Sequence, residues 1–397
     1  MLMPSMTVIA MAAAAGTGTA QQDGAADLSA RFRVRDGYIC TAVAPDVPGA
    51  RFLEVDDRGT LYISRPRPWG DILALRDEDG DGVYEKRTVF VADRPSVHGL
   101  CWRDGWLWFT TTGTVEKARD ADGDGVADET VAVIPAGQLP AGGGHWWRSL
   151  LVTEDAIYTS IGDSGNISDQ RDTERQKIWR FNLDGAGKTL FASGIRNTEK
   201  LRLRPGTTEV WGIDHGSDWF GRPLGDTPGN QPITDVYPPD ELNHYVEGGF
   251  YGHPFIVGDR IPRDEYRDRE DIHDLAARTI TPAWNFGAHW AGNGFCFVDP
   301  EINAKTGALP ADHGGDLFAA FHGSWNSTHP VGYCIARVLF DEQTGRPYGL
   351  LKIVDTLDPA TGRPLVRPVD CVQAPDGSII WSSDAPGSVY RLRAVKP

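Results

Sequence analysis

A histidine and an aspartate that could serve as a general base and its partner lie within residues 142–166. His145 follows a glycine run in GGGHWWRSL and precedes a β-rich stretch, and Asp163 ends the next such stretch in TSIGDSGN. A carboxylate beside a histidine fixes the tautomer of the imidazole and raises its basicity. An isolated histidine is more often structural, but the glycine run and the paired aspartate favour a base that takes a proton from a substrate.

Arginine, asparagine and clustered acids in the next segments could bind a planar anion and a cation. Arg196 and Asn197 begin a β-rich stretch in SGIRNTEKL, and a guanidinium fork binds two oxygens at once. WGIDHGSDWFG and PPDELNHYVEGGFYGHP are rich in glycine and acids, and oxygen-rich clusters suit Ca²⁺ far better than zinc. The acids could instead only cap turns. They are Asp214, Asp218, Asp240, Glu241 and Glu247.

Further polar side chains stand directly before β-rich stretches, in the position that His145 occupies. They are His98, His289, His322 and Arg367. Packing alone does not explain polar residues at matching positions, so the elements that carry them should bring them to a common axis.

Six short apolar stretches, most of them around Asp-Gly or Pro-Gly turns, recur along the chain and predict antiparallel hairpins. Their apolar anchors are Tyr62, Trp108, Tyr158, Trp211, Phe318 and Ile380, separated by 46, 50, 53, 107 and 62 residues. One four-stranded propeller blade spans about 40–50 residues, whereas a β-sandwich shows closer turns and no long period. The sequence predicts an all-β, six-bladed β-propeller over residues 30–395, with an insertion between the fourth and fifth blades, within 219–290.

Two aspartate-rich turns also repeat, as RDEDGDGVYE (76–85) and RDADGDGVAD (119–128). Their acids alternate in the manner of the first half of a calcium loop. Neither turn has a glutamate at the twelfth position, so neither is an EF-hand. Tight hairpin turns are the alternative, because Asp and Gly favour left-handed backbone. The candidate ligands are Asp77, Asp79, Asp81, Asp120, Asp122 and Asp124.

Charge and apolar segments restrict the partners and the location of the protein. Lys and Arg number 39 against 55 Asp and Glu, a net charge of −16, which argues against a nucleic-acid partner. Residues 7–15 are apolar but too short to span a bilayer, and no other stretch approaches a membrane span. They fit a secretory signal within residues 1–20, although no Lys or Arg precedes Arg31. We therefore expect a periplasmic or secreted protein with no stable membrane insertion.

The five cysteines are scattered and form no CxxC or CxxCH motif. This pattern predicts neither a zinc site nor covalently attached haem. An oxidising compartment would permit a disulfide, but no pairing can be deduced. Small buried side chains are the favoured interpretation for most of them.

Taken in order, the motifs resemble the soluble quinoprotein sugar dehydrogenases, which use pyrroloquinoline quinone (PQQ). The segments that carry the resemblance are GGHWWRSLLV…IYTSIGDSGN, FASGIRNTEKLRLRPGTTEVWGIDHGSDW, PPDELNHYVEGGFYGHP, AFHGSWNSTHPVGY and RPVDCVQAPDG. The branch that looks most similar contains the L-sorbosone dehydrogenase-like proteins, including the pyranose dehydrogenase propeller domain. Each motif alone is weak, whereas the ordered set over roughly residues 30–395 is specific.

The resemblance implies a catalytic role for three residues. His145 would take the hydroxyl proton of the substrate as hydride leaves for the quinone, and Asp163 would orient its imidazole. Arg196 would lie near the reacting carbonyl. Together with Arg196, the expected cofactor contacts are Asn197, His98, His289, His322 and Arg367.

The resemblance also implies bound Ca²⁺ in addition to PQQ. The backbone carbonyls of Gly216 and Ser217 would hold the ion that grips the quinone. Asp240, Glu241 and Tyr251 match a family segment associated with a structural calcium site. The expected substrate is a sugar or a sugar-derived alcohol or aldehyde. Because no haem motif is present, electrons would leave to an external acceptor, a separate cytochrome or quinone.

Four positions depart from the family pattern. Trp146 and Trp147 stand where smaller residues are frequent and could narrow the mouth of the site, and Lys200 stands where glycine is usual. Cys334 replaces a lysine, which would remove one cofactor contact. Two other functions stay open: a calcium-dependent propeller lactonase or other hydrolase, and a non-catalytic propeller that serves as a binding scaffold.

Overall fold

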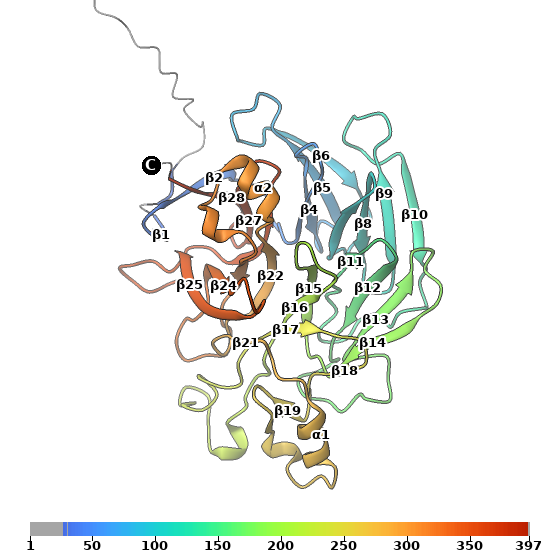
Figure 1. Ribbon diagram of the computed structural model, residues 1–397, viewed down its shortest axis with the longest axis vertical. Coiled ribbons are helices and arrows are strands. Elements are labelled where there is room, and N and C mark those ends of the chain that lie inside the picture. Colours follow the sequence, from blue (N-terminus) through green and yellow to red (C-terminus); the bar gives the residue numbers. More distant parts are fainter. Residues whose placement is uncertain (1–26, 30, 396–397) are drawn as a thin grey trace, which may run out of the picture.

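The computed structural model describes residues 27–29 and 31–395 and consists almost entirely of antiparallel sheets (Figure 1). Six sheets of four or five strands surround a common axis, which confirms the predicted six-bladed β-propeller. The predicted signal segment, residues 1–20, lies outside the described residues. In the described part of the chain, no helix is both long enough and apolar enough to cross a bilayer.

Each blade is a sheet of four strands, given below in order from the axis outward, and two blades carry a fifth strand. Blade 1 consists of β3 (Leu53–Val55), β4 (Leu61–Arg65), β5 (Asp71–Arg76) and β6 (Lys86–Val91). Blade 2 consists of β7 (Leu100–Arg103), β8 (Trp106–Thr110), β9 (Val115–Arg119) and β10 (Glu129–Ile134). Blade 3 consists of β11 (Leu151–Val152), β12 (Ala156–Ile161), β13 (Lys177–Asn182) and β14 (Thr189–Ser193), extended by β18 (Gly249–Phe250).

The other three blades continue the ring. Blade 4 consists of β15 (Thr198–Leu203), β16 (Val210–Asp214), β17 (Glu241–Tyr245) and β21 (Trp284–Asn285). Blade 5 consists of β22 (Gly292–Phe297), β23 (Leu317–Phe321), β24 (Cys334–Phe340) and β25 (Pro347–Asp355), extended by β1 (Arg33–Val34). Blade 6 consists of β26 (Pro368–Gln373), β27 (Ile379–Asp384), β28 (Gly387–Ala394) and β2 (Tyr38–Ala44).

The ring is closed by pairing between the two ends of the described chain. Strand β2, near the N-terminus, pairs antiparallel with β28, the last strand. This pairing leaves no open edge between the first and last blades, and closure is the usual way in which propellers protect their sheets. All six apolar anchors predicted from the sequence lie in the second strand of their blades: Tyr62 in β4, Trp108 in β8, Tyr158 in β12, Trp211 in β16, Phe318 in β23 and Ile380 in β27.

The inserted residues lie inside blade 4, on both sides of β17. Residues 215–240 connect β16 to β17, and residues 246–283 connect β17 to the outer strand β21. They carry the short hairpin of β19 (Ile256–Val257) and β20 (Ile261–Pro262) and the helix α1 (Ile272–Arg278), which project beyond the sheets at the bottom of Figure 1. The insertion therefore begins at residue 215, slightly before the predicted range of 219–290. It lies inside the fourth blade, ahead of its last strand, and not between the fourth and fifth blades as predicted. A second helix, α2 (Pro300–Thr306), interrupts blade 5 between β22 and β23.

Buried ion pairs join the inner strands across the axis. Lys200 on β15 donates to both carboxylate oxygens of Asp370 on β26, at 2.6 and 2.7 Å, and both side chains are buried. Asp370 also accepts a bond from the backbone N–H of Leu53, so one carboxylate connects blades 1, 4 and 6. Arg202 and Glu54 form a second pair between blades 4 and 1 at 2.7 Å. A charge buried this deeply is tolerated because it is paired and hydrogen-bonded.

Lys200→Met should lower the free energy of unfolding by about 3–5 kcal/mol, because Asp370 stays buried and loses its cation. Lys86 offers a matched control, since its pair with Glu78 lies at the surface with the lysine side chain 42% exposed. Lys86→Met should cost about 0.2–1 kcal/mol. Urea unfolding followed by tryptophan fluorescence measures both changes, and equal losses would contradict a structural role for the axial pair.

Candidate active site

An axial cavity of about 420 Å³ gathers most of the predicted polar residues, and its volume is within the range of small-molecule sites. Its walls come from loops before the inner strands and after the second strands of the blades. The predicted residues that line it are His145, Arg196, Asn197, Gly216, Asp240, His289, His322 and Arg367. The propeller thus brings together side chains that lie up to 222 residues apart in the sequence.

His145 is held as a neutral imidazole. Its Nδ1 lies 3.0 Å from the backbone carbonyl oxygen of Asp163, and a carbonyl only accepts, so Nδ1 carries the proton. Burial and the positive charge of Arg196 lower the pKa of His145 to about 3. Its Nε2 is therefore an unprotonated acceptor, as a general base requires.

Asp163 orients His145 through its backbone, and not through the carboxylate that we expected to do so. The carboxylate instead lies 2.8 Å from Nε2 of His253 and accepts bonds from the backbone N–H groups of Gly165 and Ser168. These partners face away from the cavity, so they hold the loop after β12 in place. The resulting loop conformation fixes the carbonyl that receives the proton of Nδ1.

Arg196 and Asn197 are positioned by a buried carboxylate. The backbone N–H groups of both residues donate to Asp214, at 2.8 and 2.7 Å. The guanidinium of Arg196 donates to the backbone carbonyl and to the side-chain oxygen of Asn166, at 3.0 and 2.8 Å, and lies 3.3 Å from Asp218. These contacts keep the positive charge beside His145.

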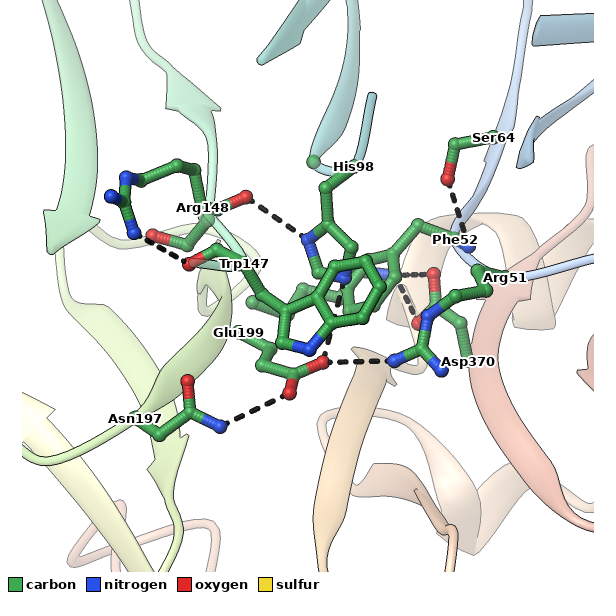
Figure 2. Close-up of polar contacts among 12 residues, drawn as sticks. Arg51, Phe52, Ser64, His98, Trp147, Arg148, Asn197, Glu199 and Asp370 are labelled. Atoms are coloured by element: carbon green, nitrogen blue, oxygen red, sulfur yellow. Dashed lines mark hydrogen bonds and ion pairs between the residues drawn. The ribbon is translucent and has the colours of Figure 1, made fainter. Parts of the chain in front are cut away.

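A connected set of charged side chains forms the floor and one wall of the cavity (Figure 2). Arg51 bonds Glu199 at 3.2 Å and Asp384 at 2.9 Å, and its guanidinium stacks on the indole of Trp147 at 4.3 Å. Glu199 also accepts a bond from Asn197 at 3.1 Å. Because the guanidinium of Arg51 contacts Glu199, Asp384 and Trp147 at once, it holds the indole of Trp147 in one place.

His98 does not line the cavity, which corrects the prediction that it contacts a cofactor. It is fully buried one layer below Trp147, with its ring between Phe52 at 4.0 Å and Trp147 at 4.5 Å (Figure 2). Its Nδ1 bonds the backbone carbonyl of Arg148, and its Nε2 lies 3.5 Å from Glu199. His98 therefore supports the wall from below, and its Nε2 has no hydrogen-bond partner within the described residues other than the 3.5 Å contact with Glu199.

Two further predicted residues, His322 and Arg367, are paired with each other and connect to Arg51 through Asp384. Arg367 donates to Nδ1 of His322 at 2.9 Å, so Nε2 of His322 donates to Asp384 at 3.0 Å. His289 bonds the backbone carbonyl of Thr234 in the insertion at 2.6 Å. Arg367 keeps further donors for a ligand, since an arginine carries five N–H groups.

A small pocket of about 20 Å³, the size of one water molecule or ion, adjoins the axial cavity. Gly216, Ser217 and Glu241 line it. A Cβ atom on Gly216 would lie 2.6 Å from the carbonyl oxygen of Pro239 and 2.9 Å from that of Pro238. The glycine thus leaves room for a cradle of backbone oxygens beside a carboxylate, which is the donor set that Ca²⁺ prefers.

The acids around this pocket repel one another in the absence of a cation. Burial and the neighbouring charge of Asp214 raise the pKa of Glu241 to about 8. Asp240 lies on the side of the axial cavity and accepts bonds from the backbone N–H groups of Gly216 and Ala291. Tyr251 lines the pocket, but its hydroxyl is already bonded to the backbone of His244 and Val246, so we no longer expect that hydroxyl to bind the ion.

The aspartate-rich turns lie outside the axial cavity. Carboxylate oxygens of Asp77, Asp79, Asp81 and Glu85 lie within 4.8 Å of one another, as do those of Asp120, Asp122 and Asp124. The same carboxylates accept bonds from backbone N–H groups of their own turns, for example from Gly82 and Gly125. The turn interpretation is confirmed, and calcium binding there stays a prediction.

All five cysteines are free and buried, as small core side chains. Cys334 packs inside β24 and does not line the axial cavity, and the expected loss of a cofactor contact at this position stays a prediction. Trp147 does line the cavity, and Trp146 stacks on it at 3.7 Å.

Sequence reasoning missed several residues of the site. Arg51 stands directly before an inner strand, as His98 and His145 do, so the same positional signal could have found it. Glu199 lies within β15 and Asp384 at the end of β27, where nothing in the local sequence distinguishes them from structural acids.

Comparisons with known proteins agree with the propeller fold. The fold is similar to that of the Trichoderma reesei carbohydrate-active enzyme of family AA12, with a TM-score of 0.77 and 20% identity over 92% of this chain and 98% of that one. It is also similar to the holo form of the pyranose dehydrogenase PQQ domain from Coprinopsis cinerea, with a TM-score of 0.76 and 17% identity over 91% and 97% of the two chains.

A sequence relative from Borreliella burgdorferi, described as uncharacterized, is 26% identical over 244 residues, which are 59% of this chain and 56% of that protein. The chain thus spans about half the length of the curated relatives it matches. The family model described as TrAA12-like matches residues 32–395, nearly the whole propeller. The resemblance inferred from the motifs is confirmed, and the chain belongs to the TrAA12-like family.

Proposed function

We propose that the protein is a PQQ- and Ca²⁺-dependent oxidoreductase that oxidises a sugar or a sugar-derived alcohol or aldehyde. The observation that carries this proposal is one cavity that holds a neutral histidine base and three guanidinium groups, with an adjoining cradle of oxygens. The related Coprinopsis structure is, by its description, a holo form of a PQQ domain.

The side chains of the cavity fit PQQ, a planar molecule with three carboxylates. Arg196 and Arg367 supply donors, Asn197 lines the same cavity with its amide N–H groups bonded to Glu199 and His215, and Trp147 supplies a flat apolar face. Guanidinium groups bind carboxylates in pairs of hydrogen bonds. We assign these residues to the cofactor.

The adjoining pocket fits Ca²⁺. Gly216 and Ser217 would hold the ion with backbone oxygens, and Glu241 would supply a carboxylate. A bound cation would offset the burial and the repulsion from Asp214 that together raise the pKa of Glu241. When bound, PQQ supplies the oxidant that accepts hydride, and Ca²⁺ supplies positive charge beside it.

The chain itself contributes a base, a charge and a shaped wall to this reaction. Nε2 of His145 takes the hydroxyl proton of the substrate, since the Asp163 carbonyl keeps the other nitrogen protonated. The guanidinium of Arg196 stabilises negative charge that develops next to the base. Trp147, fixed by Arg51, excludes water from one side.

Hydrolysis is a weaker proposal for this geometry. A calcium-dependent lactonase would use the cation and the histidine, but it has no use for both Arg196 and Arg367 in the same cavity. A binding scaffold does not require a histidine whose pKa is lowered to about 3. We also propose export from the cytoplasm, on the basis of the apolar residues 7–15, and an external electron acceptor.

His145→Ala should lower kcat by about 10²–10⁴-fold, because the proton loses its acceptor. PQQ should still bind with unit stoichiometry, measured by its absorbance, since Arg196 and Arg367 remain. Dye reduction with a panel of aldoses, in the presence of PQQ and Ca²⁺, gives the rate. His273→Ala is the control, because this exposed histidine lies on α1. Full activity of His145→Ala, or lactone hydrolysis without bound quinone, would contradict the proposal.

Gly216→Ala should remove one tightly bound calcium ion per chain, because the new Cβ would lie against the carbonyl oxygens of Pro238 and Pro239. Gly349→Ala is the control, since its Cβ would meet only ordinary contacts from 3.5 Å outward. Calorimetric titration with Ca²⁺ counts the sites. At about 100 times the dissociation constant, the ion should add about 2.7 kcal/mol to the stability of the unmodified protein. An unchanged number of sites in Gly216→Ala would refute the assignment.

The imidazole of His145 should stay neutral in the cofactor-free protein from about pH 8 to about pH 5, because its pKa is lowered from 6.5 to about 3. The unfolded chain binds a proton here near pH 6.5, so the stability due to the neutral imidazole is present above that pH and is lost as the pH falls towards 3. NMR of ¹⁵N-labelled imidazoles, with the signal assigned through His145→Gln, measures the titration. A midpoint near the ordinary value of 6.5 would be the opposite result.

A further inference from the structure

A second cavity, of about 360 Å³, opens beside the mouth of the axial cavity. Trp325 lines both, so a ligand could extend from one into the other. The mouth cavity is formed by the insertion of blade 4 and by the loop after β23. Its lining residues are Trp219, Pro228, Gly229, Gln231, Trp325, Asn326, Ser327 and Thr328.

The lining of the mouth cavity carries no charged side chain. The protein as a whole has a net charge of −16, so an uncharged polar surface beside the site is a local property. The charged groups that adjoin the lining are already engaged: the guanidinium of Arg222 stacks on Trp219 at 4.2 Å, and Asp235 accepts bonds from Gln231 and Thr328. The lining itself therefore offers neither a cation for an anionic ligand nor a carboxylate for a cation. A neutral ligand rich in hydroxyl groups fits this surface best.

Trp325 offers an exposed aromatic face at the junction of the two cavities. Its side chain is 73% exposed, an unusual position for so large an apolar group. The face of an indole ring is electron-rich, so it attracts the partly positive C–H groups of a pyranose ring. Stacking on a sugar would cover this apolar surface without requiring a charge.

Asn326 provides an unpartnered polar group in the same cavity. Only 7% of the residue is exposed, and neither its side-chain nitrogen nor its oxygen has a hydrogen-bond partner within the described chain. A buried polar atom left without a partner destabilises the folded protein. A sugar hydroxyl both donates and accepts, so hydroxyls of one residue could satisfy both atoms of the amide.

The two segments that form the mouth cavity are tied together before any ligand binds. Asp235 of the insertion accepts bonds from the backbone N–H of Thr328 at 2.9 Å and from Gln231 at 2.8 Å. Gln231 also donates to the backbone carbonyl of Asn326. Trp219 is held with a φ of +58°, a strained backbone for a bulky residue, which is typical of functional sites. The cavity is therefore preorganised.

We propose that the mouth cavity is a second sugar subsite, and that the protein acts on the terminal residue of a neutral oligosaccharide. One sugar residue reaches His145 in the axial cavity, while the next stacks on Trp325 and bonds Asn326. This inference rests on the proposed function, because it assigns the class of substrate to the same site.

The first experiment measures binding without oxidation. Cellotriose, maltotriose, mannotriose and glucose are titrated into the PQQ-free protein by calorimetry. At least one trisaccharide should bind about tenfold or more tightly than glucose, since an aromatic contact contributes up to about 1.5 kcal/mol. Trp325→Ala and Asn326→Ala should each remove this preference, whereas Trp69→Ala, at a 43% exposed tryptophan outside both cavities, should keep it.

The second experiment measures turnover of the same sugars by the enzyme loaded with PQQ and Ca²⁺. Trp325→Ala should raise KM for the preferred trisaccharide about tenfold more than it raises KM for glucose. Equal binding of all four sugars, or a preference that survives Trp325→Ala, would overturn the subsite. A change in oligomeric state of Trp325→Ala with no change in sugar binding would do the same, because it would assign the indole to a protein interface.

The two experiments separate the two proposals. Trisaccharide binding that depends on Trp325, with no oxidation of any sugar, would refute the proposed oxidoreductase and support the subsite. Oxidation of sugars without a preference for trisaccharides would support the oxidoreductase and refute the subsite.

Discussion

The pairing of buried charges on the propeller axis is the constraint on which the site depends. Inner strands from all blades converge there, and a charge that water cannot reach must find a partner on another blade. Asp370 meets this requirement by binding Lys200 and the backbone of Leu53, so one carboxylate sets the spacing of three blades. The loops that carry functional side chains begin where these strands end.

Charged side chains are also paired across blades at the floor of the axial cavity, above the pair of Lys200 and Asp370. Arg51 is shared between Glu199 and Asp384 and stacks on Trp147, so a single cation couples blades 1, 4 and 6 to the wall of the site. Such a wall is rigid without a ligand, and rigidity before binding reduces the entropy that binding must remove. The geometry offered to a cofactor is therefore a property of the folded chain.

The insertion in blade 4 supplies parts of the site that the repeated four-stranded sheets do not provide. Its residues 215–240 provide one side of the cation pocket, a partner for His289 and a wall of the mouth cavity. Propeller scaffolds are repetitive, so residues specific to one ligand tend to lie in the loops between strands. In this protein, the proposed oxidation and the proposed choice of oligosaccharide depend on adjacent parts of one insertion.

The sequence alone determined the architecture and most members of the site. Apolar anchors at a blade-length period predicted six blades, because each blade must bury the same face, and polar residues before strands predicted the lining of the axial cavity. Tertiary structure decided which atom of each residue is used. Asp163 serves through its carbonyl, His98 lies below Trp147, and Asn326 is left without a partner. Local sequence could not show this, because burial and hydrogen bonding depend on blades that are distant in the chain.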